Sequence, residues 1–191
     1  AILRAFFEGY PDLKRGMDRT QKFARENGYV EAFTGHRRRV PEVFSRDEQI
    51  VARALRQVVN FPVQCAAAQM TNMALCLIEE DMRAGGFDSV MNLTVHDSIL
   101  FDVHVDELFD LMVLVRNAME SVPQRSDEVF PGLDWSWLTV PIVADLEVGF
   151  NWGSLVALSE CKVGGVEHVI DVDDPDVDLL WSAMTEKFEA A

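Results

Sequence analysis

The spacing of apolar side chains along the chain predicts helices and short strands in an irregular order. Apolar residues three or four positions apart indicate a helix face, whereas strict alternation indicates a strand. We expect helices over residues 2–27 (interrupted near Pro11), 45–59, 62–84 and 106–121. We expect hairpins over residues 29–40 and 90–103, and a last strand over residues 140–148. Separate helices mixed with short antiparallel strands favour the α+β class.

Particular residues mark the ends of these predicted elements. Gly28 and Gly85 stand where helices are expected to end, since glycine is enriched just past the last helical turn. Ser45, followed three residues later by Glu48, is typical of a helix start. Pro62 is predicted to break one helix and begin the next, because proline suits the first turn of a helix but not its interior.

The last part of the chain, residues 159–191, differs in composition from the rest. It carries nine acidic side chains against two lysines and has few aromatic residues. Such a composition is typical of disorder, because too little apolar surface is available for burial. We therefore expect an acidic, poorly ordered tail that includes a short amphipathic helix around residues 181–188.

Charge is distributed unevenly along the 191 residues. The formal net charge is −15, but the first 60 residues carry +4. The overall acidity argues against a simple phosphate-backbone binder, whereas the basic first third could face a polyanion. Apolar runs are shorter than a membrane span requires, so we expect no membrane partner. Three cysteines without metal or disulfide spacing indicate reduced thiols and a cytoplasmic location.

The first candidate site is the tripeptide His96-Asp97-Ser98 between two predicted strands. A carboxylate on a tight turn is a good ligand for a hard cation such as Mg²⁺. The alternative is that Asp97 only forms the turn, as aspartate often does. Because both flanking strands are strongly apolar, we expect the turn to stand on a buried, rigid platform, which favours the functional interpretation.

A second candidate site consists of Arg56, Asn60 and Gln64, spaced by four residues around the predicted helix break. Their planar polar groups suit base edges and sugar–phosphate oxygens. The alternative is ordinary helix capping, with Asn60 as the capping residue.

A third candidate is the basic strand formed by Arg37, Arg38 and Arg39. Such a strand can lie along a phosphate backbone. It can equally be a solvated edge strand, on which charges prevent aggregation. In an otherwise acidic chain, the clustering of arginines favours the first interpretation.

The order of these segments resembles the C-terminal part of family A, DNA polymerase I-like, DNA polymerases over about residues 1–158. The segments that carry the resemblance are Gly28-Tyr29-Val30-Glu31, Gly35-His36-Arg37-Arg38-Arg39-Val40-Pro41, Arg56-x3-Asn60-x-Pro62-x-Gln64, Val95-His96-Asp97-Ser98-Ile99-Leu100-Phe101 and Val140-Pro141-Ile142-x4-Glu147-Val148-Gly149-x2-Trp152. The resemblance implies a fragment of the polymerase right-hand fold. Residues 1–45 would be a fingers remnant with the basic hairpin. Residues 46–158 would be the palm, a small antiparallel sheet with a catalytic hairpin packed against long helices.

The resemblance also implies roles for the candidate residues. Asp97 would be one of two catalytic aspartates that bind a pair of Mg²⁺ ions, and His96 would lie beside the primer terminus. Arg56, Asn60 and Gln64 would contact primer–template DNA near the nascent base pair. The basic hairpin would lie at the junction of fingers and palm. The implied activity is template-directed DNA synthesis from dNTPs, in the cytoplasm of a bacterial or phage-infected cell.

Two departures from the family pattern change this expectation. Ser98 stands where the family usually has glutamate, so it is a weak candidate for a metal ligand, and His-Asp-Ser also resembles single-subunit RNA polymerases. The chain has no counterpart of the nucleotide-binding fingers helix or of the strand with the first catalytic aspartate. We therefore expect it to be inactive alone and to need the missing N-terminal portion as a partner. The alternative function is a non-catalytic primer–template DNA-binding module.

Overall fold

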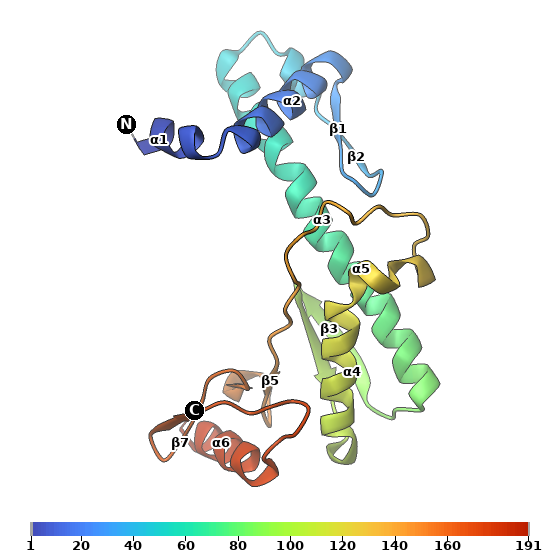
Figure 1. Cartoon of the computed structure of the whole chain (residues 1–191), viewed down its shortest axis with the longest axis vertical. Coiled ribbons are helices and arrows are strands. Elements are labelled where there is room, and N and C mark those ends of the chain that lie inside the picture. The colour runs from blue at the N-terminus through green and yellow to red at the C-terminus, as the bar shows by residue number, and fades with distance from the viewer. Residues whose placement is uncertain (1, 191) are drawn as a thin grey trace. The chain divides into compact units, whose positions relative to one another are not determined.

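The computed structural model describes residues 2–190, which divide into two units within helix α3, one ending at Met70 and the other beginning at Thr71 (Figure 1). The elements of the first unit are α1 (Ile2–Gly9), α2 (Pro11–Asn27), β1 (Tyr29–Glu31), β2 (Arg37–Arg39), the 3-10 helix η1 (Pro41–Phe44) and the first part of α3 (Glu48–Gly85). This boundary differs from the expected divisions after residues 45 and 158.

The first unit has a small core beneath the β1–β2 hairpin. Gly28 has a φ angle of 73°, and its N–H donates to the carbonyl of Ala24, which ends α2 where the sequence predicts. The hairpin that follows pairs Tyr29 with Arg39 in antiparallel register. The apolar side chains that pack together here are Ala24, Val30, Val40, Val43, Ala54, Leu55 and Val58. Helix α2, the hairpin and α3 therefore hold one another through this cluster.

Helix α3 is continuous through Pro62, so the predicted helix break at this residue is wrong. Proline removes one backbone hydrogen bond and costs about 3 kcal/mol in a helix interior. The helix nevertheless runs on without interruption from Glu48 to Gly85. The predicted capping box is also absent: Asp47, not Ser45, accepts the backbone N–H of Gln49, at 2.8 Å.

The second unit continues α3 and adds the remaining elements. These are β3 (Val90–Val95), β4 (Ser98–Asp102), η2 (Val105–Glu107), α4 (Leu108–Glu120), α5 (Val122–Arg125), η3 (Ser126–Glu128), β5 (Glu147–Val148), η4 (Trp152–Ser154), β6 (Val156–Ala157), β7 (Cys161–Val163), β8 (Val166–His168) and α6 (Val177–Glu189). The α+β class is confirmed. The described strands pair only two by two, in four antiparallel sheets, rather than in the single small sheet expected.

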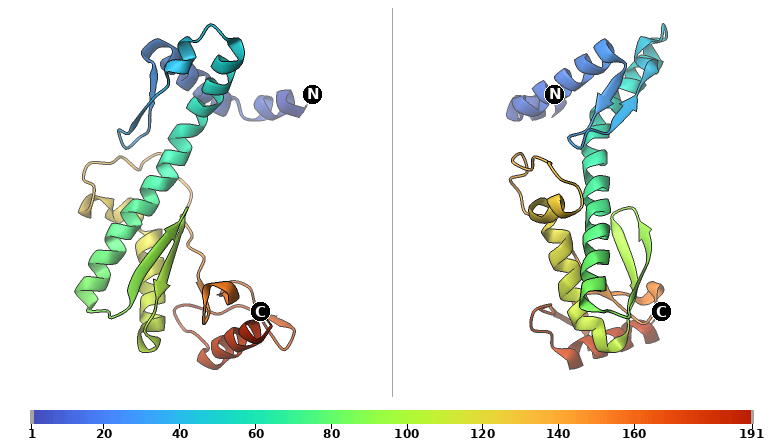
Figure 2. Two further views of the ribbon diagram at one scale, coloured as in Figure 1. Left: turned by 180° about the vertical axis from the view of Figure 1, so that it is seen from behind. Right: turned by 90° about the vertical axis from the view of Figure 1, so that its right-hand side faces the viewer.

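Two helices form the scaffold of the second unit. Figures 1 and 2 show α4 alongside the second part of α3. Leu77 and Ile78 of α3 are fully buried, and Leu111 and Val115 of α4 nearly so. At the end of this pair, Arg125 donates to both carboxylate oxygens of Asp81, at 2.6 and 2.8 Å, which ties α5 to α3.

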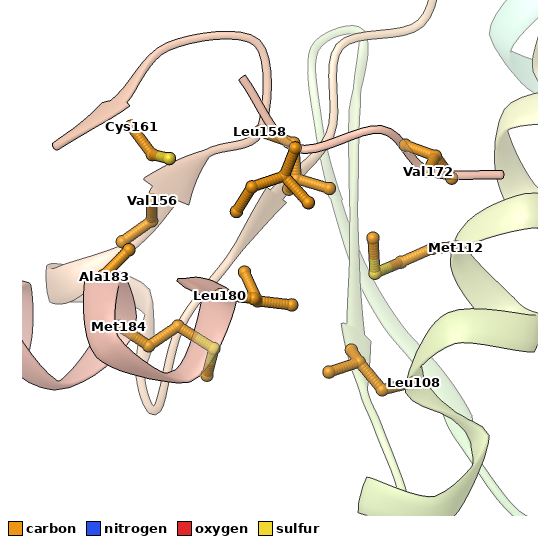
Figure 3. Close-up of a cluster of buried hydrophobic side chains, with 10 residues drawn as sticks. Leu108, Met112, Val156, Leu158, Cys161, Val172, Leu180, Ala183 and Met184 are labelled. Atoms are coloured by element: carbon orange, nitrogen blue, oxygen red, sulfur yellow. The ribbon is translucent and has the colours of Figure 1, made fainter. Parts of the chain in front are cut away.

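The last part of the chain, residues 155–190, is folded in the structure, in contrast to the poorly ordered tail predicted from its charge. We call it the C-terminal module. Its side chains pack with those of α4 in one cluster of buried residues: Leu108, Met112, Val156, Leu158, Cys161, Ile170, Val172, Leu180, Ala183 and Met184 (Figure 3). Ala183 and Met184 follow Leu180 by three and four positions, so α6 has an apolar face despite its acidic surroundings.

The region between α5 and the C-terminal module contains less strand than predicted. Only Glu147–Val148 of the expected strand over residues 140–148 pairs, and it pairs with β6. After β5 the chain turns back at Gly149, where a Cβ atom would lie 2.5 Å from the carbonyl oxygen of Ser154. Only glycine fits this close approach of two backbone segments.

Among the described helices, α3 is long and apolar enough to cross a membrane, judged by length and composition alone, with a mean hydropathy of 1.2 over 18 residues. Long core helices have the same properties. Within the structure, 22% of this 18-residue window is buried.

The open end of the β3–β4 hairpin is held by Glu107. The backbone N–H groups of Asp88 and Ser89 donate to its carboxylate at 2.8 Å each, and the hydroxyl of Ser89 donates at 2.6 Å. The Ser89 hydroxyl oxygen in turn accepts the backbone N–H of His104 at 2.9 Å. These hydrogen bonds, that from Asp88 most of all, hold the pKa of Glu107 below its usual value of 4.5. The carboxylate thus joins the residues before β3 to those after β4.

We expect Glu107→Gln to lower the melting temperature at pH 7, because the amide has one acceptor oxygen and no charge for three donors. The lowered pKa means that the ionised carboxylate stabilises the fold above pH 4.5, and that this contribution is lost as the pH falls through the folded-state pKa. The difference in melting temperature between wild type and variant should therefore close below pH 4.5. Thermal unfolding followed by circular dichroism, from neutral pH down to about pH 3, measures it.

Glu80→Gln is the matched control, because the exposed Glu80 makes no side-chain hydrogen bond within the described residues. If the melting temperature of Glu107→Gln differed from that of the wild type by the same amount at every pH, the carboxylate charge would not be what holds the hairpin.

Candidate metal and nucleic-acid sites

His96 and Asp97 form the two-residue turn of the β3–β4 hairpin. Val95 pairs with Ser98 in antiparallel register, so the two residues between them lie outside the ladder. Both side chains are exposed. The structure therefore displays the imidazole and the carboxylate next to one another at the tip of the hairpin, as the sequence predicts.

The backbone at His96 is in an unfavourable conformation. Its φ angle is 59°, a positive value that no other non-glycine residue has in the described part of the chain. Two-residue hairpin turns with a positive φ at their first position usually place glycine there. A side chain held in such a conformation costs on the order of 1–3 kcal/mol, and such residues cluster at functional sites. The strain is therefore an observation in favour of a functional role for this turn.

The platform beneath the turn is less buried than predicted. A β-bulge between Met91 and Leu93 shifts the register of β3, which brings Val90, Leu93 and Val95 to the same face of the hairpin. These three side chains are 54%, 47% and 36% exposed. The apolar composition of the strands, which suggested burial, here produces an exposed apolar face.

The donor set at the turn fits part of a magnesium site. The Asp97 carboxylate is a hard oxygen ligand of the kind Mg²⁺ prefers, and the neighbouring Ser98 adds only a neutral hydroxyl. Among the residues that the structure describes, no group of three His, Cys, Asp or Glu side chains is placed to hold a metal ion. Asp97 can thus supply one carboxylate, and the other ligands of a paired site would have to come from outside this part of the chain.

The three arginines of β2 are all exposed but have different surroundings. Arg37 forms an ion pair with Glu31 and lies over the ring of Tyr29, 4.9 Å from its centroid. The hydrogen bond to Glu31 and the charge of its carboxylate raise the pKa of Arg37. Arg38 donates to the side-chain oxygen of Gln57 at 3.2 Å. Neither Arg38 nor Arg39 forms an ion pair within the described residues, and Arg39 makes no side-chain hydrogen bond there either, so its guanidinium has the fewest partners of the three.

Arg56, Asn60 and Gln64 lie on one exposed face of α3. Because the helix is continuous, consecutive members are one helical turn apart, about 6 Å along the axis. Asn60 lies twelve residues inside the helix, which excludes the capping role considered for it. These side chains and the β2 arginines belong to the first unit, whereas His96 and Asp97 belong to the second.

Sequence reasoning missed two sets of tertiary contacts, those that hold the ends of the β3–β4 hairpin and those that tie α5 to α3. Ser89 and Glu107 are 18 positions apart and Asp81 and Arg125 are 44 apart. No periodicity or short motif links residues over such distances. The only local signal was the position of Glu107 immediately before α4, where acidic residues are common.

Comparisons with known proteins identify the family of the chain. The profile of DNA polymerase family A matches residues 1–154. The chain is 34% identical to DNA polymerase I of Streptococcus pneumoniae serotype 4 over 152 residues, which are 80% of this chain and 16% of that protein. It is 28% identical to the DNA polymerase of Bacillus phage SP01 over 177 residues, 92% of this chain and 19% of that protein.

A solved structure of a polymerase domain is also similar to this chain. The POL domain of Pol1 from M. smegmatis, in complex with a DNA primer-template and dNTP, superimposes with a TM-score of 0.59 and 29% sequence identity. The match covers 62% of this chain and 21% of that one. The chain thus spans about a sixth to a fifth of the length of these relatives. Because the family profile covers most of its residues, the chain belongs to DNA polymerase family A.

Proposed function

We propose that this chain is the C-terminal part of a DNA polymerase that extends a primer with dNTPs along a template. Residues 1–45 would be a fingers remnant and residues 46–158 the palm. The observation that carries the proposal is the His96–Asp97 turn, which is exposed, strained at His96 and located within the family-matched region. The relatives named DNA polymerase I and the neighbour solved with primer-template and dNTP support it.

Asp97 would be the metal ligand of this turn. Together with a carboxylate from the missing N-terminal portion it would hold a pair of Mg²⁺ ions, whose charge would stabilise the attacking and leaving oxygens of nucleotidyl transfer. The two-residue turn fixes where the carboxylate stands, because the Glu107 hydrogen bonds hold the ends of its two strands. His96, next to it, would contact the primer terminus.

The basic first third would bind the primer–template. Arg39 and Arg38 would contact phosphates, whereas the ion pair with Glu31 reduces what Arg37 can contribute. Arg56, Asn60 and Gln64 present planar donors and acceptors at intervals of one helical turn, which suits successive positions along a strand of DNA. The strongly acidic remainder of the chain would stay away from the phosphates.

A non-catalytic primer–template DNA-binding module is the second candidate function. The presence of Ser98 in place of the expected glutamate, and the single carboxylate at the turn, favour it. A fragment related to single-subunit RNA polymerases is less favoured, since the matching relatives are DNA polymerases. The bacterial and phage origin of these relatives supports a cytoplasmic location.

We expect the chain alone not to extend a primer, because one carboxylate cannot hold two metal ions. Extension of an end-labelled primer in Mg²⁺ should give no product, and the missing N-terminal portion of the polymerase should restore synthesis. Robust Mg²⁺-dependent extension by the 191 residues alone would contradict the proposed role as a fragment.

In the complete polymerase, Asp97→Asn should lower single-turnover nucleotide incorporation by about 10²–10³-fold or more, because the amide lacks the charge that would hold the cation. Primer–template affinity should change little. Asp102→Asn, at the other end of the same hairpin, and Ser98→Ala should stay close to wild type. If Asp97→Asn incorporated nucleotide at a near-normal rate and Ser98→Ala did not, Asp97 would not be the metal ligand. If the wild-type polymerase incorporated no nucleotide, the non-catalytic DNA-binding module would be favoured.

Replacing Arg37, Arg38 and Arg39 with alanine should weaken primer–template binding and flatten its salt dependence, by about 0.9 in the logarithmic slope for each phosphate that is no longer neutralised. Among single variants, Arg39→Ala should have the larger effect and Arg37→Ala the smaller one, since Glu31 already compensates Arg37. Fluorescence anisotropy between about 50 and 300 mM salt measures both, with Arg83→Ala as control. An unchanged slope in the triple variant would identify β2 as a solvated edge strand.

A further inference from the structure

Three aromatic rings form an exposed patch at the junction of the family-matched region and the C-terminal module. The ring of Phe150 stacks on Trp181, with ring centroids 5.7 Å apart, and meets the ring of Phe188 edge to face at 5.7 Å. Phe150 and Phe188 are 49% and 50% exposed. We call Phe150, Trp181 and Phe188 the aromatic patch. Trp152, 60% exposed, lies on η4, which also packs against α6.

The aromatic patch borders the core of the C-terminal module but is not enclosed by it. Leu180, Ala183 and Met184 point into the buried cluster shown in Figure 3, and Trp181 touches the edge of that cluster. Trp181 and Phe188 are seven residues apart, two helical turns, and so share one side of the helix. Half-exposed rings of this size leave a large apolar area in water, which is typical of an interaction surface.

Acidic side chains accompany the aromatic patch. Asp178, three residues before Trp181, and Glu189, directly after Phe188, lie toward the same side of α6 by helical spacing. Both are exposed, and neither forms an ion pair within the described residues. Residues 155–191 as a whole carry a formal charge of −7. A ligand of the patch would therefore meet apolar rings bordered by negative charge.

This combination of rings and carboxylates disfavours two possible occupants. Single-stranded nucleic acid stacks on aromatic side chains, but it needs a basic groove for its phosphates, and this surface is acidic. A second copy of the chain that docked through the same acidic module would bring like charges together, which costs free energy across an interface. Charge complementarity favours a cationic ligand with its own apolar side chains.

We propose that the aromatic patch of the C-terminal module docks a basic amphipathic segment of a partner protein. Apolar side chains of the segment would cover Phe150 and Phe188. Lysine or arginine side chains would lie over the exposed rings of the patch, where cation–π attraction adds to binding, and would pair with Asp178 and Glu189. The module would thus give the polymerase a protein-docking site that is separate from the basic residues assigned to DNA.

The experiment uses the intact 191-residue chain and a synthetic amphipathic peptide of about 18 residues, five helical turns with lysine on one face and leucine on the other. Binding is measured by isothermal titration calorimetry. We expect saturable binding that Phe188→Ser weakens by about tenfold or more. Val166→Ser is the matched control, because Val166 is 58% exposed on the same module but lies on the β7–β8 hairpin. Circular dichroism confirms that both variants remain folded.

Further measurements on the carboxylates and on a second peptide test the proposal. Asp178→Asn with Glu189→Gln should weaken binding and lower its salt dependence, and a peptide with glutamate in place of lysine should not bind. Absence of binding by the lysine peptide, equal loss in Phe188→Ser and Val166→Ser, or equal binding of the glutamate peptide would overturn the proposal. The proposal would also be overturned if Phe188→Ser abolished binding of single-stranded DNA, or self-association of the chain, but left peptide binding unchanged.

Discussion

The carboxylate of Glu107 determines where the β3–β4 hairpin stands. It accepts hydrogen bonds from Asp88 and Ser89 just before β3, and through the Ser89 hydroxyl it also holds His104 just after β4. A two-stranded hairpin by itself is only marginally stable in water. With its ends fixed at the start of α4, the hairpin can carry the strained turn at His96 and keep Asp97 at a defined place.

The chain separates its two proposed tasks along α3. Side chains suited to DNA, such as Arg56 and Asn60, lie in the part of the helix that packs with the β1–β2 hairpin. The turn with Asp97 belongs to the unit that begins at Thr71. Positive charge is concentrated in the first 60 residues and negative charge in the rest. A metal ligand benefits from acidic surroundings and a phosphate-binding surface does not, so this separation suits both tasks.

Features that depend on a few neighbouring residues could be predicted from the sequence. Gly28 ends α2 through its positive φ angle. The apolar runs on either side of His96-Asp97-Ser98 placed the hairpin turn, although Ser98 belongs to β4 and only His96 and Asp97 form the turn. Features that local preference does not decide could not. Pro62 has a local preference for breaking a helix, yet α3 runs through it, and the hydrogen bond between Ser89 and Glu107 joins residues 18 positions apart.

Charge composition was the most misleading signal. The acidic residues after position 159 suggested disorder, whereas the spacing of Leu180, Ala183 and Met184 is enough to bury α6 against its neighbours. In the same way, the apolar strands of the β3–β4 hairpin suggested burial, but Val90 and Leu93 are exposed. Burial depends on what lies opposite a side chain, and the sequence of one element does not contain that information.

The cluster that joins α4 to the C-terminal module also shows that the family match and the folded core of this protein have different limits. The family profile ends at residue 154, yet Val156 and Leu158, just beyond it, share one apolar core with Leu108 and Met112 inside it. Burial of each such side chain contributes about 1.5–3 kcal/mol. Truncation at the end of the family match would therefore leave Leu108 and Met112 with exposed apolar surface. A stable piece of this chain has to follow the limits of its core rather than those of the family profile.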